Sequence, residues 1–109
     1  MGEVVTLHEY YPPRLLFAGT TGRALVAYSI SSGGIAEHLD VIRTDNPAFG
    51  SAAIQFMRDW HFDVPTDWSK DGGPEHRFRL QVMFVIDGRP APKPWYPNIM
   101  TFPIEGKVR

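Results

Sequence analysis

The stretch from Phe49 to Pro65, FGSAAIQFMRDWHFDVP, decides how this chain folds. Its apolar side chains recur at intervals of three and four, the repeat of one helix face. They are Phe49, Ala52, Ala53, Phe56, Met57 and Trp60. Just upstream, Asn46 can accept a bond from the first amides of a helix and Pro47 suits its first position. We therefore expect a helix from Pro47 to about Trp60 that packs on an apolar surface, with Pro65 forbidding its continuation.

A hairpin is predicted before this helix. Residues 23–31 alternate, with Ala24, Val26, Tyr28 and Ile30 on one face. Ser32-Gly33-Gly34 has turn chemistry, and residues 35–43 return with Leu39 and Val41 on the buried side. Upstream of the hairpin, Pro13 suits the start of a short helix over residues 14–18 that ends at Gly19.

A long strand is predicted after the helix, over residues 75–87. Phe78, Leu80, Val82, Phe84 and Ile86 share one face, and Arg77, Arg79, Gln81, Met83 and Val85 share the other. A strand that is polar on one side is typical of an antiparallel sheet covered by helices on one face. The fold class is therefore α+β. This last strand is expected at an edge of the sheet, where another chain can pair with it; the alternative is a central strand.

Composition excludes some function classes. The 109 residues carry 11 basic and 12 acidic side chains, a formal net charge of −1, which argues against a nucleic-acid partner. An RNA-binding sheet using Tyr28 and Phe78 is disfavoured by the same balance. There is no cysteine, so disulfides and thiolate sites are excluded. No signal peptide is visible, and the apolar run Val82–Ile86 is far short of the about 20 residues that a bilayer requires.

The sequence gives little support for catalysis. The four histidines, His8, His38, His61 and His76, show none of the helical spacings of a zinc site. Glu37, His38 and Asp40 lack an accompanying nucleophile signature, and no phosphate or dinucleotide fingerprint occurs. We therefore expect no enzyme, no cofactor and no metal.

The C-terminal segment differs from the rest of the chain. Prolines at every second position from Pro90 to Pro94 predict a stiff, extended stretch. Tyr96-Pro97 followed by Gly106 repeats the order of Tyr11-Pro12 and Gly22. We expect a domain over residues 1–88 and a linker or tail over 89–109. A truncated second copy of the domain and a final strand added to a sheet are the alternatives.

The order and spacing of these features resemble the C-terminal domain of TonB-type energy transducers over about residues 11–88. The resemblance rests on the following residues: Tyr11-Pro12, Gly22, Gly33-Gly34, Leu39, Val41, Ala52-Ala53, Trp60-x-Phe62, Pro65 and the strand from Phe78 to Ile86. The chain departs from the family at Arg43-Thr44-Asp45-Asn46, where a serine-rich stretch is frequent, and in its long loop over residues 66–74.

The resemblance implies a periplasmic domain with two helices on one face of a three-stranded antiparallel sheet. It implies that the domain grips the TonB box of an outer-membrane transporter by strand addition. Force would come from proton-driven inner-membrane motor proteins, through an anchor outside the present sequence. The resemblance and the open edge together predict these partner-binding residues: Arg77, Arg79, Gln81, Met83 and Val85 on the pairing strand, with Tyr10, Tyr11 and Pro12 beside it.

A second interpretation uses the same edge without a transporter. An exposed strand also suits a structural interaction module, in which tandem or oligomeric copies pair through their edges. A homodimer through edge strands is compatible with either interpretation. Upstream sequence would separate them, because a membrane span and a proline-rich spacer favour a transducer.

Overall fold

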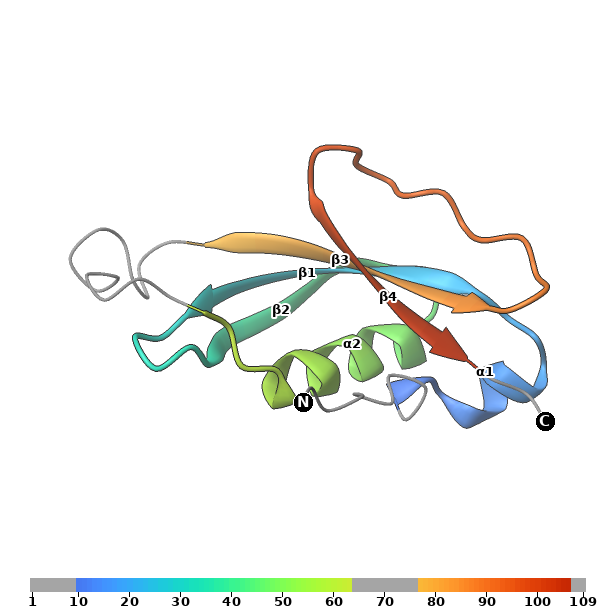
Figure 1. Ribbon diagram of the computed structural model, residues 1–109, viewed down its shortest axis with the longest axis horizontal. Coiled ribbons are helices and arrows are strands. Elements are labelled where there is room, and N and C mark those ends of the chain that lie inside the picture. Colours follow the sequence, from blue (N-terminus) through green and yellow to red (C-terminus); the bar gives the residue numbers. More distant parts are fainter. Residues whose placement is uncertain (1–9, 64–76, 107–109) are drawn as a thin grey trace, which may run out of the picture.

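The computed structural model describes residues 10–63 and 77–106 as a two-layer α+β domain. Its elements, in chain order, are α1 (Pro13–Phe17), β1 (Gly22–Ile30), β2 (Ala36–Thr44), α2 (Pro47–Asp59), β3 (Phe78–Ile86) and β4 (Met100–Gly106). The strands form one sheet, and both helices lie on the same face of it (Figure 1). The predicted loop over residues 66–74, with Trp68, lies outside the described residues.

Helix α2 begins where the sequence predicts. The side chain of Asn46 accepts a hydrogen bond of 2.9 Å from the amide of Ala48, and Pro47 is the first helical residue. The residues that the helix buries are Phe49, Gly50, Ala53, Phe56 and Met57. Trp60 follows the last turn and packs on Phe56, with 5.5 Å between ring centroids. The apolar stripe is thus confirmed as the face that contacts the sheet.

Helix α1 is a short helix that ends at Phe17, and Gly19, two residues later, has a φ of +72° that suits glycine. No helix among residues 10–63 and 77–106 has the length and hydrophobicity needed to cross a membrane.

The first two strands form the expected hairpin. β1 and β2 pair antiparallel, with register irregularities between Leu25 and Val26 and between Ala27 and Ser29. Gly34 closes the turn at a φ of +83°, and its carbonyl accepts a hydrogen bond of 2.8 Å from the amide of Phe62. The hairpin turn is thereby joined to the segment that leaves α2.

The core lies between the sheet and the helices. The buried faces of β1 and β3 are those that alternation predicts: Ala24, Val26, Tyr28 and Ile30, and Leu80, Val82, Phe84 and Ile86. Phe49 of α2 stacks on Phe84 with ring centroids 4.4 Å apart. Tyr11 packs edge-on against both rings, so the chain entering α1 closes one end of the core.

The sheet differs from the expected one. It has four strands in the order β2-β1-β3-β4, and β4 pairs parallel to β3. The three expected strands pair antiparallel as β1, β2 and β3, and the α+β class is confirmed, but the expectation is wrong in lacking the fourth, parallel strand. A parallel pair needs a crossover of a dozen or more residues, which residues 87–99 provide. This crossover, called the strap below, passes over the face of the sheet opposite the helices (Figure 1).

Candidate functional site

β3, the strand predicted to bind a partner, is not at an edge. It pairs with β1 along one flank and with β4 along the other. The expectation of an open edge at β3 is therefore wrong for this structure, because the C-terminal segment of the chain already occupies the position of an added strand. The partnership comprises seven residue pairs, from Leu80 with Met100 to Ile86 with Gly106.

Only three of the five residues predicted to bind on this segment pair with β4. Gln81, Met83 and Val85 lie within the ladder to β4, opposite residues 101, 103 and 105. Arg77 and Arg79 precede its first pair. The guanidinium of Arg77 instead donates a hydrogen bond of 2.7 Å to the carbonyl of His38. His38 belongs to β2, which is at the edge of the sheet opposite β4. The flank of β3 that β4 covers is therefore lined by residues 80–86.

β4 places alternate side chains in the core. Ile104 is fully buried in the main cluster. Phe102 packs against Phe56 at 4.8 Å and Trp60 at 5.1 Å between ring centroids. Gly106 is also buried, at the end of the strand. Removing β4 would thus open an apolar channel between β3 and the helices.

Gln81 connects β3 to the strap and to β4 on the other face of the sheet. Its side chain is fully buried. Its Nε2 donates to the carbonyl of Tyr96 at 2.6 Å and to the hydroxyl of Thr101 at 2.9 Å. Its Oε1 accepts from the amide of Trp95 at 3.1 Å. A buried amide must have such partners, so Gln81 holds the strap in one register.

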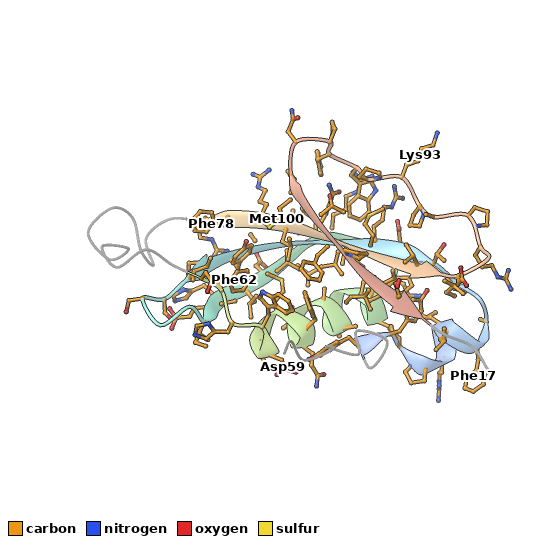
Figure 2. The ribbon with its side chains drawn as sticks, viewed as in Figure 1. Phe17, Asp59, Phe62, Phe78, Lys93 and Met100 are labelled. Atoms are coloured by element: carbon orange, nitrogen blue, oxygen red, sulfur yellow. The ribbon has the colours of Figure 1, made fainter. Side chains whose placement is uncertain are left out.

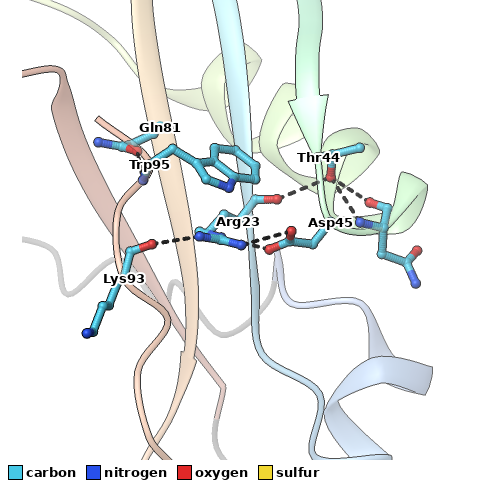
Figure 3. Close-up of polar contacts among 7 residues, drawn as sticks. Arg23, Thr44, Asp45, Gln81, Lys93 and Trp95 are labelled. Carbon is cyan, nitrogen blue, oxygen red and sulfur yellow. Dashed lines mark hydrogen bonds and ion pairs between the residues drawn. The ribbon is translucent and has the colours of Figure 1, made fainter. Parts of the chain in front are cut away.

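Trp95 fastens the strap to β1 and β2, and Figure 3 shows its ring beside Arg23 of β1. The guanidinium groups of Arg23 and Arg43 lie 4.5 and 4.4 Å from the centroid of its ring. Arg23 also donates to the carbonyl of Lys93 at 2.9 Å and forms an ion pair of 2.9 Å with Asp45. The Lys93 side chain points away from the sheet (Figure 2), so its main chain makes this contact. The strap is therefore held independently of β4.

The two outer edges of the sheet are poor templates for an added strand. β2 carries the register irregularities noted above, and His38 within it has a φ of +53°. Such bulges twist an edge and interrupt its row of hydrogen-bonding groups. β4 contains Pro103, which has no amide proton to donate.

Tyr10, Tyr11 and Pro12 lie at the helical layer rather than beside a free strand. The hydroxyl of Tyr10 donates to Asp59 at 2.9 Å. All three, with residues of α2, line an open pocket of about 410 Å³ on the surface of the helical layer. Tyr11 is buried, and of the three it is the one that meets the end of β4, because a Cβ on Gly106 would lie 2.9 Å from its ring.

Burial changes the acidity of Tyr11. Its hydroxyl donates a hydrogen bond to the carbonyl of Thr20. Loss of solvent around the phenol disfavours the phenolate and raises the pKa of Tyr11 to about 12. At neutral pH the phenol is protonated and serves as a hydrogen-bond donor.

Within the described ranges, no three histidine, aspartate or glutamate side chains gather as a metal site. His38 contacts Ser29, with 2.9 Å between Nδ1 and Oγ, but Ser29 is fully buried. His8 and His76 lie outside the described residues.

The feature that sequence reasoning missed is the role of Gln81. A final strand added to the sheet was one alternative for the C-terminal segment, and β4 is such a strand. Its parallel direction, and the strap that buries Gln81, have no local signal in the sequence.

A model of the family described as Gram-negative bacterial TonB protein C-terminal matches residues 8–86. No curated protein matches the chain. The matched segment contains α1, β1, β2, α2 and β3 and ends at the last residue of β3. The strap and β4 lie beyond it.

Proposed function

We propose, on the premise that the chain belongs to the family of TonB C-terminal domains, that it binds an extended segment of an outer-membrane transporter. This family comprises periplasmic, transport-associated domains of Gram-negative bacteria. The bound segment would correspond to a TonB box. The domain would pass mechanical load to it from proton-driven inner-membrane motor proteins.

The proposed binding place is the flank of β3 that β4 covers. The observation that carries this proposal is that β4 pairs with β3 over seven residues while lying outside the family-matched segment. The flank can thus accept a parallel strand from a separate stretch of chain. Binding would occur by exchange: β4 leaves, and the transporter segment pairs with Gln81, Met83 and Val85 in its place.

Two properties favour exchange over addition to an outer edge. β2 has bulges and β4 has a proline, so neither offers a regular row of donors and acceptors. The β3–β4 pair is parallel, which is slightly less stable per residue than an antiparallel pair. The strap remains clamped at Trp95 during exchange, so the movement is confined to β4.

Strand pairing also suits the transmission of force. Main-chain hydrogen bonds distribute a shearing load over the length of the strand, whatever the side chains of the partner. The bonded strand is itself packed on α2 through the core, so load on β3 reaches the whole domain.

The test is a titration of the ¹⁵N-labelled full chain with a synthetic peptide carrying a TonB box. We expect the amide resonances of residues 80–86 to shift and those of residues 100–106 to move to coil positions. The control is the same peptide with alternate amides N-methylated, which removes its pairing donors. Shifts confined to β2, or to the pocket beside Tyr10, would contradict exchange at β3.

A further inference from the structure

We propose that the covered flank of β3 selects its ligand by side chain as well as by backbone. The pattern is a hydroxyl residue, an aromatic residue, any residue, a branched aliphatic residue, any residue and glycine. This inference rests on the proposed exchange, because it takes the positions of Thr101, Phe102, Ile104 and Gly106 as those that the incoming segment fills. The ligand class is thus a short extended peptide with this alternation.

The first position is read by Gln81. With the strap in place, Gln81 keeps its bonds to the carbonyl of Tyr96 and the amide of Trp95. The other N–H of its buried amide has the hydroxyl of Thr101 at 2.9 Å as its nearer acceptor and the carbonyl of Ile99 at 3.4 Å as a longer one. A ligand that offers valine there would leave this donor with only the long contact to the Ile99 carbonyl, and the loss of the shorter bond at a buried amide is costly.

The second position is an aromatic subsite. Phe102 packs between Phe56 and Trp60, at 4.8 and 5.1 Å between ring centroids. An edge-to-face contact with Trp60 favours another aromatic ring over an aliphatic chain of similar size.

The fourth position is the most deeply enclosed. Ile104 is opposite Phe84 in the ladder and is 0% exposed. A charged side chain there would be buried without a partner. A branched aliphatic side chain fills the space and is favoured in extended backbone.

The last position admits only glycine. A Cβ on Gly106 would lie 2.6 Å from Cδ1 of Leu16 and 2.9 Å from Cδ2 of Tyr11. Tyr11 packs edge-on against the stacked rings of Phe49 and Phe84, so it cannot turn aside freely. Thr101, Pro103 and Glu105 are all exposed. The selectivity at Thr101 rests on its bond to Gln81, whereas Pro103 and Glu105 leave the choice of side chain open.

The experiment measures binding of fluorescein-labelled peptides by anisotropy. The probe is a capped peptide with the sequence of residues 100–106, MTFPIEG. The receptor is the full chain with Ile104→Ala, which weakens the competing β4. The same peptides are also measured on the unaltered chain, in case the Ile104→Ala variant misfolds. There β4 competes with every peptide and lowers all affinities by the same factor, so the ratios between peptides are unchanged.

Four altered peptides test the four positions: Thr101→Val, Phe102→Ala, Ile104→Asp and Gly106→Val. We expect each to bind about tenfold or more weakly than the probe, whereas Glu105→Gln at an exposed position changes affinity less than about threefold. In a Gln81→Leu receptor the preference for Thr over Val at position 101 should disappear, while the penalty of Gly106→Val persists.

The outcomes separate this inference from the function on which it rests. Equal affinity for all the altered peptides, with a TonB-box peptide still bound at residues 80–86, overturns the side-chain pattern alone. Failure of every peptide to bind either receptor, the TonB-box peptide included, overturns strand exchange and the pattern with it.

Discussion

Gln81 of β3 and Thr101 of β4 are partners in the parallel ladder, and their side chains are joined by a hydrogen bond of 2.9 Å. This link places the end of the chain beside the strand that ends the family-matched segment. The structure therefore shows a TonB-type domain whose third strand is already paired by a neighbouring stretch of its own chain.

Ile104→Ala should destabilise the domain, whereas Met100→Ala should not. Both residues belong to β4, but Ile104 is fully buried and Met100 is 65% exposed. We expect the free energy of unfolding to fall by about 2–4 kcal/mol for the first and by less than about 0.5 kcal/mol for the second. Urea denaturation at fixed protein concentration measures both. Equal effects would mean that β4 does not complete the core.

Trp95→Ala should loosen the strap and β4 without unfolding the sheet. It removes the ring held by Arg23 and Arg43. Two such contacts at a partly exposed site are worth about 1–2 kcal/mol, so β4 amides should exchange with deuterium about ten times faster. Lys93→Ala is the control, because only the carbonyl of Lys93 bonds to Arg23. Unchanged exchange in Trp95→Ala would exclude the strap as the support of β4.

Two adjacent glycines of the hairpin turn should respond differently to alanine. Gly34 has a φ of +83°, and a Cβ there would collide with the carbonyl oxygen of Phe62. A Cβ on Gly33 would meet only Ser31 Oγ, at 3.7 Å. We expect Gly34→Ala to lower the free energy of unfolding by more than about 1 kcal/mol and Gly33→Ala to have little effect. Thermal denaturation of the two variants measures this difference. A larger loss of stability for Gly33→Ala than for Gly34→Ala would contradict the turn geometry.

Alkaline pH should destabilise the domain in part through Tyr11. Its pKa is about 12 when folded and 10 when exposed, so above pH 10 the unfolded chain loses a proton that the folded chain retains. Stability should therefore fall as the pH rises from 10 to 12, by up to about 2 kcal/mol from this group. Tyr11→Phe should be less stable at pH 8, where it lacks the bond to Thr20, but should show a shallower alkaline decline. If stability declined equally steeply with pH in both proteins, ionisation of Tyr11 would not be a cause of the decline.

The helices and the first three strands follow from local patterns in the sequence. Asn46 and Pro47 set the start of α2, and alternation set the inward faces of β1 and β3. These features depend on neighbours in the chain, so residue spacing reveals them. The same is true of Gly34, where a turn requires positive φ.

The candidate site was harder to predict from the sequence, because it depends on contacts between residues that are distant in the chain. Gln81 was expected on an exposed polar face, yet the strap covers that face and buries it. Burial of Gln81 follows from a crossover whose direction no local pattern specifies. β4 itself was only one of the alternatives for the C-terminal segment, and its Pro103 is compatible with a strand at an edge.

Locking β4 in place tests strand exchange most directly. Val85 and Glu105 are ladder partners, and adjacent strands lie about 4.8 Å apart, within reach of a disulfide. The chain has no cysteine, so Val85→Cys with Glu105→Cys can form a single internal bond. A matched control joins β1 to β2 through Ala27→Cys with Asp40→Cys.

The decisive measurement is the affinity of a TonB-box peptide for the oxidised and reduced forms of both double variants. The account predicts that oxidation of the β3–β4 pair abolishes binding, that reduction restores it, and that the β1–β2 control binds in both states. Undiminished binding to the oxidised β3–β4 variant would contradict the account, because the peptide would then be using another surface.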